Sequence, residues 1–333
     1  MTSGSFNLPG GVEDILSERA LELENLRRSL IDCYSQKGFS LVYPSIIEFA
    51  DAIGGEVNSE LKKRAYTFSD DSSSSEIAIR PDISQQIARI DQTNNSEDVK
   101  KYCYAGEVIK KRKDSFAKSI LAIKSGIEIF GSENSEQEVI DLLIESLKIS
   151  GLTNVCLSMG RTEILDEIIS SETLSNFKER ELREITSNKS ESNLIDWSEE
   201  NKLSKNVIEK ILILMQCYGD SQCLDEVIKF SKLAKDSVDS LKRITENIAY
   251  ENIHFDMTDF PGFNYHQGLV FSAHIENFGF AIANGGQYSY QKIEGEKRPA
   301  IGFDIDLISL FKNCFGFSHL IEILYFLLFF ADK

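Results

Sequence analysis

The stretch Tyr102–Gly131, YCYAGEVIKKRKDSFAKSILAIKSGIEIFG, decides the fold. Apolar residues alternate with other residues over 102–109 and again over 124–130, which is the pattern of β-strands that bury one face. The basic segment KKRKDSFAK at 110–118 separates the two runs. We therefore predict two paired antiparallel strands joined by a long polar loop.

Composition narrows the classes of protein to which the chain can belong. Its 333 residues are enough for one large domain or two. Thirty-six Lys and Arg against fifty-three Asp and Glu give a net charge of −17, which opposes broad contact with a phosphate backbone. Six cysteines without a CxxC pair, and no secretory signal, predict reduced thiols in the cytoplasm and no metal site.

A long helix and a strand are predicted near the N-terminus. Apolar residues at helical spacing follow a Pro-Gly-Gly sequence and predict a helix over 12–36. Alternation over 39–43, closed by Pro44, predicts a strand. The sequence EIAIRPDISQQIARI at 76–90 predicts a short strand and then a helix that begins just after Asp82.

The second half of the chain divides by composition. NSEQEVIDLLIESLKIS at 134–150 predicts an amphipathic helix, and alternation over 155–159 predicts a strand. Many Glu, Lys and Ser residues with helical apolar spacing then follow. We predict that 161–252 is an inserted, largely helical subdomain with its own small core, between the parts 1–160 and 253–333 of one core domain.

The framing of the opening stretch resembles motif 2 of class II aminoacyl-tRNA synthetases, in the form found in histidyl-tRNA synthetases. Gly106, Gly126, Glu128 and Gly131 match the glycines and the glutamate of that motif. The resemblance implies an α+β fold, with a class II synthetase-like antiparallel sheet flanked by helices. The helical insertion is added to that fold.

Further stretches resemble the same family, and they occur in the family's order. The segment that ends at Pro44 resembles motif 1, which builds the dimer interface, although an ordinary helix and strand also fit. Arg80-Pro81-Asp82 resembles the segment whose acid binds the amino group of histidine, whereas a lone Asp82 is simply an acid favoured by the helix dipole. The stretches 260–291 and 299–311 resemble the histidine-specific motifs and motif 3.

Three arginines that hold ATP phosphates in that family are replaced here. Lys110 stands at the motif 2 arginine, Pro261 at the histidine-specific one and Ser309 at that of motif 3. A guanidinium makes two parallel bonds to a phosphate, whereas Lys is a point charge and the proline ring has no donor. We therefore predict no adenylation, no catalytic residue and no cofactor, since the transition-state charge lacks its donors.

The amino-acid pocket of the family is better preserved. The resemblance implies an effector pocket for histidine made of Asp82, Lys110, Lys124, Glu128, Tyr265, His266 and Tyr288. Asp82 and Glu128 suit an ammonium, which needs a carboxylate partner in a partly dry site, and the two tyrosines suit rigid walls. As an alternative, Lys124 pairs with Glu128 and fills the site with an internal salt bridge.

After motif 3 comes SHLIEILYFLLFFADK, which is too short to span a bilayer, and we expect no anticodon-binding domain. A synthetase-like chain without that domain and without the phosphate arginines resembles the regulatory subunits of ATP phosphoribosyltransferase. The resemblance implies a cytoplasmic subunit without catalysis of its own. Such a subunit joins a short-form catalytic subunit in a hetero-octamer with a homodimeric core, activates it, and transmits inhibition by L-histidine.

Two alternatives stay open at this point. A degenerate histidine–tRNA ligase needs a basic face for tRNA and an anticodon-binding domain. A free-standing synthetase paralogue that activates another acceptor needs the phosphate arginines. We expect neither a nucleic acid nor a membrane as partner.

Overall fold

The structure is a computed structural model, which describes residues 8–53, 59–70, 74–94, 96–111, 120–152, 154–259, 266–276, 278–292 and 295–311. The strands of its large sheet are β1 (Ser40–Leu41), β5 (Lys100–Ile109), β6 (Leu121–Phe130), β7 (Val155–Arg161), β8 (Tyr218–Gly219), β9 (Ile253–Asp256), β10 (His266–Ile275), β11 (Ala281–Gln291) and β12 (Lys297–Asp306). They lie in the order β1-β5-β6-β12-β11-β10-β7-β9-β8.

The predicted strand pair forms one half of this sheet. β5 and β6 are antiparallel and pair from Lys100 opposite Phe130 to Ile109 opposite Leu121, which confirms the prediction. β6 continues the sheet by pairing antiparallel with β12. The middle of the loop between β5 and β6 lies outside the described residues.

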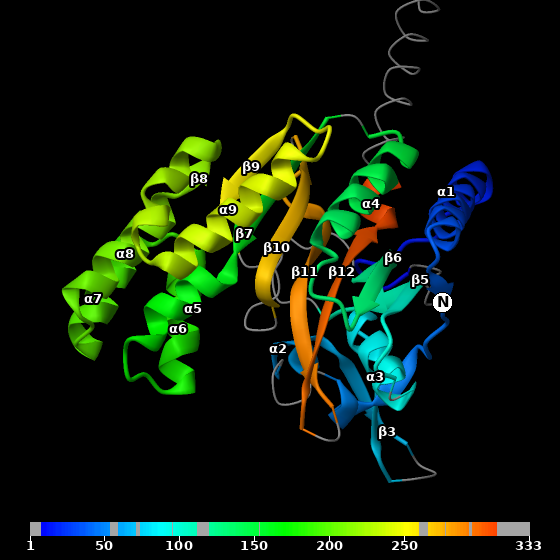
Figure 1. Cartoon of the computed structure of the whole chain (residues 1–333). Coiled ribbons are helices and arrows are strands. Elements are labelled where there is room, and N and C mark those ends of the chain that lie inside the picture. Colours follow the sequence, from blue (N-terminus) through cyan, green and yellow to red (C-terminus); the bar gives the residue numbers. More distant parts are fainter. Residues whose placement is uncertain are drawn as a thin grey trace, which may run out of the picture.

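The helices α1 (Ser17–Gln36) and α4 (Glu136–Ile149) pack against each other and against the part of the sheet formed by β5, β6 and β12 (Figure 1). Both were predicted, but α1 begins five residues later than expected. Leu16 has extended backbone and Ser17 has a φ of 56°, which interrupts a right-handed helix at this point. α1 buries Leu30 and Tyr34 completely against the sheet.

Helices dominate residues 161–252, in the form of α5 (Thr162–Ser170), α6 (Asn176–Ser187), α7 (Glu191–Asn201), α8 (Lys205–Gln216) and α9 (Lys232–Glu246). They cover the β7 end of the sheet, far from α1 (Figure 1). Their buried side chains belong to the same continuous cluster as those of the sheet, so the expected separate small core is not found. The reason is that α5 and α9 pack on β10 and β7, while β8 and β9 extend the sheet itself. The division into domains stays a prediction.

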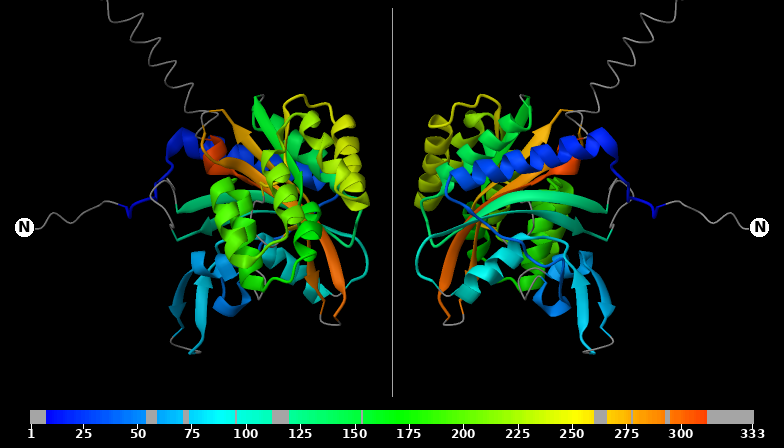
Figure 2. Two further views of the ribbon diagram at one scale, coloured as in Figure 1. Left: turned by 90° about the vertical axis from the view of Figure 1, so that its left-hand side faces the viewer. Right: turned by 90° about the vertical axis from the view of Figure 1, so that its right-hand side faces the viewer.

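A small sheet of β2 (Ile47–Phe49), β4 (Glu76–Ile79) and β3 (Tyr66–Ser69) projects from the end of the molecule opposite α1 (Figure 2). The short helix α2 (Ser59–Arg64) accompanies it, and the predicted helix after Asp82 is α3 (Ser84–Asn94). Within the described ranges, no helix is long and apolar enough to cross a membrane. The apolar tail at 312–333 lies outside these ranges.

Candidate functional site

The expected site residues that the structure describes come together where the start of α3 faces β5, β6 and β11. Asp82 lies two residues before the first residue of α3, and Lys110 follows the last residue of β5. Lys124 and Glu128 lie on β6, and Tyr288 lies on β11. Five positions spread over more than 200 residues of sequence thus meet in one site.

Arg80 fixes the segment that carries Asp82. Its guanidinium donates to the carbonyl oxygens of Glu107 at 2.7 Å and Pro44 at 2.8 Å. It therefore joins the chain between β1 and β2 to β5. The side chain passes directly over Gly106, where an added Cβ would lie 2.3 Å from Arg80 Nη2. Gly106 is therefore needed for this close approach, and it indirectly sets the position of Asp82.

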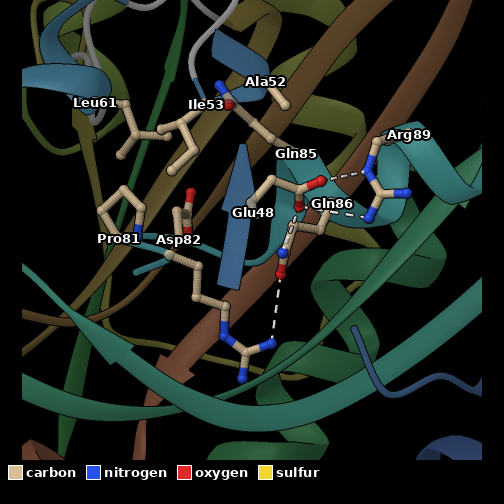
Figure 3. Close-up of a pocket in the computed structure, with 10 residues that line it drawn as sticks. Glu48, Ala52, Ile53, Leu61, Pro81, Asp82, Gln85, Gln86 and Arg89 are labelled. Carbon is tan, nitrogen blue, oxygen red and sulfur yellow. Dashed lines mark hydrogen bonds and ion pairs between the residues drawn. The ribbon is translucent and has the colours of Figure 1, made fainter. Parts of the chain in front are cut away.

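A pocket beside this segment is drawn in Figure 3. Glu48 is one of the residues that line it: its Oε2 accepts from Gln86 Nε2 at 2.6 Å, and its Oε1 lies 2.9 Å from Arg89 Nε. Gln86 and Arg89 thus both bond to Glu48. We therefore interpret these contacts as structural, because they hold in place the segment that carries Asp82.

Glu128 is the most deeply buried carboxyl of the site, with 2% of its surface exposed. The hydroxyl of Tyr288 donates to its Oε2 at 3.0 Å. Gly302, directly opposite on β12, makes room for it, because an added Cβ would lie 2.2 Å from Oε2. Burial raises the pKa of Glu128 to about 8, although hydrogen bonds from Ser84 and Tyr288 act in the opposite direction. The carboxyl is therefore mainly protonated at neutral pH in the ligand-free protein.

Lys124 does not pair with Glu128, so that alternative is wrong. Its Nζ lies 2.5 Å from Oδ1 of Asp304 on β12. Lys124 and Glu128 share a face of β6, but they are four residues apart, which is about 13 Å along a strand. Asp304 is closer to Lys124 because it lies on β12, which pairs directly with β6. Burial alone lowers the pKa of Lys124, but the carboxylates of Asp304 and Asp306 outweigh it and hold the pKa above its ordinary value.

Asp82 and Lys110 complete the charged lining. Burial raises the pKa of Asp82, and the ammonium of Lys110 opposes that change. Burial also lowers the pKa of Lys110, helped by the charge of Lys124. In the described part of the site, four acids accompany two lysines, namely Asp82, Glu128, Asp304 and Asp306 with Lys110 and Lys124. A cationic ligand group such as an ammonium would lie favourably beside Asp82 and would stabilise the ionised form of Glu128.

The remaining expected residues are only partly described. Tyr265 and Pro261 lie outside the described residues. His266 begins β10, and its backbone pairs opposite Tyr288. Ser309, at the position expected for the motif 3 arginine, donates from Oγ to Asp306 Oδ2 at 2.9 Å. Asp306 itself caps the local helical turn, because its Oδ1 accepts from the backbone N–H groups of Ile308 and Ser309.

Asp304 and Tyr104 lie in the site although the sequence alone did not indicate them as site residues. Tyr104 is fully buried, and its hydroxyl lies 3.3 Å from Ser84 Oγ. Gly126 leaves the space for this ring, since an added Cβ would lie 2.8 Å from the Tyr104 hydroxyl. The only sequence signal for Asp304 was its alternation with Asp306 between apolar residues at the end of β12, which does not identify its partner.

Comparisons with known proteins identify the family of the chain. The sequence profile of the histidyl-tRNA synthetase family matches residues 11–310. Proteins named ATP phosphoribosyltransferase regulatory subunit from Cellvibrio japonicus and Thioalkalivibrio sulfidiphilus are each 30% identical to the chain. The matches cover 94% and 93% of this chain, respectively, and 82% of each relative.

Solved structures share the fold. An ATP phosphoribosyltransferase regulatory subunit/histidyl-tRNA synthetase from Bacillus halodurans has a TM-score of 0.77 at 20% identity, over 92% of this chain and 83% of its own. A chain of the ATP phosphoribosyl transferase (HisG:HisZ) complex from Thermotoga maritima has a TM-score of 0.65 at 16% identity, over 86% of this chain and 97% of its own. The predicted class II synthetase-like fold is thereby confirmed. The chain belongs to the family of ATP phosphoribosyltransferase regulatory subunits, which are relatives of histidyl-tRNA synthetases.

Proposed function

We propose that the chain is a non-catalytic regulatory subunit that a short-form ATP phosphoribosyltransferase catalytic subunit requires for activity. In this proposal it also transmits feedback inhibition by histidine in the first step of L-histidine biosynthesis. The complex is a cytoplasmic hetero-octamer with a homodimeric core of this chain. The names of the relatives, and a HisG:HisZ complex among the structures with this fold, support a catalytic partner of this class.

One observation carries the absence of catalysis, namely that residues at the phosphate positions are engaged internally or have no suitable donor. Ser309 is bonded to Asp306, and the proline ring at position 261 has no donor. Burial lowers the pKa of Lys110, and a lysine offers a phosphate only a point charge. Adenylation needs donors arranged in advance around the developing charge, and removal of one such donor typically costs about 3–4 kcal/mol of transition-state stabilisation.

The amino-acid side of the site supports histidine as the effector. Glu128 and Asp82 accept from the ligand ammonium, and the Tyr288 ring forms a wall beside them. Binding of the ammonium shifts Glu128 to its ionised form, because a nearby positive charge favours the carboxylate. Charge-assisted hydrogen bonds of this kind contribute about 1.5–3 kcal/mol each.

An exchange assay and a binding assay together test the proposal. We expect no amino-acid-dependent ATP–pyrophosphate exchange with any standard amino acid, while L-histidine raises the thermal stability of the same preparation in complex with its catalytic subunit. Histidinol, which keeps the ammonium but lacks the carboxylate, is the matched ligand control. Exchange clearly above background would instead favour a free-standing synthetase paralogue that activates another acceptor.

A further inference from the structure

Two cysteines that play no part in the site above are in direct contact. The sulfur atoms of Cys217 and Cys223 lie 3.3 Å apart, and Cys217 Sγ also lies 3.0 Å from the carbonyl oxygen of Cys223, so its single proton can point to either acceptor. Both are free thiols. Cys217 is the C-cap residue of α8, and Cys223 lies in the short 3₁₀ helix η2 (Ser221–Asp225).

The backbone holds this contact in place from both ends. Tyr218 and Gly219, which form β8, pair with β9 directly after Cys217. Gly219 has a φ of 133°, which favours glycine and lets the chain turn back. Asp220 then caps η2 by accepting from the N–H of Gln222 at 2.9 Å. Two residues six positions apart therefore meet because the turn between them is anchored to the sheet.

We propose that Cys217 and Cys223 are a redox-active dithiol that forms an intramolecular disulfide by exchange with a small disulfide such as oxidised glutathione. The Cys223 thiolate attacks one glutathione sulfur and expels the other glutathione as a thiolate, which takes up a proton. The Cys217 thiol then loses its proton, attacks Cys223 Sγ and expels the second glutathione. Two cysteine thiols are oxidised, and one glutathione disulfide is reduced to two thiols.

The two thiols have different roles because their surroundings differ. Cys223 is partly exposed, whereas Cys217 is 2% exposed. The hydrogen bond from Cys217 lowers the pKa of Cys223 and raises that of Cys217, so Cys223 is the better attacking thiolate. A disulfide bond is about 2.05 Å long, so the two sulfurs need to approach by only about 1.2 Å.

Alkylation mapping of the full chain tests this inference. The protein is equilibrated with graded ratios of oxidised to reduced glutathione, quenched with acid, alkylated, and analysed by intact mass and peptide mapping. We expect a species that lacks two alkyl groups and yields a linked peptide containing Cys217 and Cys223. In Cys217→Ser we expect glutathione trapped on Cys223, and in Cys223→Ser we expect no adduct on Cys217.

Cys156→Ser is the matched control, because Cys156 is also a partly exposed free thiol but lies outside the pair. Its removal should leave the linked peptide unchanged. Full alkylation of both Cys217 and Cys223 in the wild-type chain, at ratios that already modify Cys156, would overturn the inference. So would a disulfide from Cys223 to any other cysteine. If either serine variant fails to fold, the peptide map of the wild-type chain is sufficient to test the inference.

Discussion

Replacement of Glu128 by Gln should change how the stability of the protein depends on pH. The folded-state pKa of Glu128 is about 8, raised by burial from an ordinary value of 4.5. The folded protein therefore keeps a proton that the unfolded chain releases. The resulting stability is fully present below about pH 4.5 and is lost as the pH rises through 8.

The size of this effect follows from the shift. Each pH unit within the window contributes at most about 1.4 kcal/mol, so the upper bound over the whole window is about 4–5 kcal/mol. Gln keeps an oxygen that accepts from the Tyr288 hydroxyl, but it does not titrate. The free energy of unfolding of the wild type, minus that of Glu128→Gln, should therefore fall steadily between pH 5 and pH 8.

Urea denaturation at pH 5, 6, 7 and 8 measures this difference. Glu24→Gln is the matched control, because hydrogen bonds from Arg27 and Arg28 hold the pKa of Glu24 at about 2. The contribution of Glu24 is present above the ordinary value of 4.5 and is lost only at lower pH, so it is constant in the measured range. Parallel stability curves for the wild type and Glu128→Gln would refute the assignment of a buried, protonated Glu128.

Three further predictions concern the ligand, the dimer and the core. Glu128→Ala should weaken histidine binding to the complete complex by roughly tenfold to a hundredfold in calorimetry, and an unchanged affinity would mean that inhibition uses another site. Tyr43→Asp should dissociate a homodimer built on the motif 1 segment, whereas Phe177→Asp should not, although the two side chains are 72% and 70% exposed. Light scattering at micromolar concentration measures the mass of each variant. Equal masses for the two variants would contradict an interface at the motif 1 segment. Asp91→Asn removes the partner of the buried Arg298, 2.7 Å away, and should lower the free energy of unfolding by about 3–5 kcal/mol; a loss below 1 kcal/mol in urea would show that the pair is not essential.

The strand pair and the main helices could be predicted because their signals are local. Alternation over 102–109 and 124–130 predicted β5 and β6, and helical spacing predicted α1 and α4. The start of α1 was missed because the positive φ of Ser17 leaves no mark in the apolar pattern. Local patterns indicate which face of an element is buried, but not which element covers it.

The contacts inside the site could not be predicted for that reason. The partner of Lys124 is Asp304, 180 residues away, and the pairing depends on β6 and β12 being neighbours in the sheet. Similarly, no CxxC spacing marked Cys217 and Cys223, whose contact depends on a turn anchored to β9. Resemblance to a family supplied Asp82, Glu128 and Tyr288 as one site, which periodicity alone did not connect.

Reconstitution with a short-form ATP phosphoribosyltransferase catalytic subunit tests the central claim most directly. The rate of phosphoribosyl transfer is measured for the catalytic subunit alone and with this chain, each with and without L-histidine, and the complex is sized in parallel. We predict that the chain raises the rate, that histidine inhibits only the complex, and that Glu128→Ala keeps the activation but loses sensitivity to histidine. Co-purification of the two subunits without any change in rate, or equal inhibition of the catalytic subunit alone, would contradict the claim.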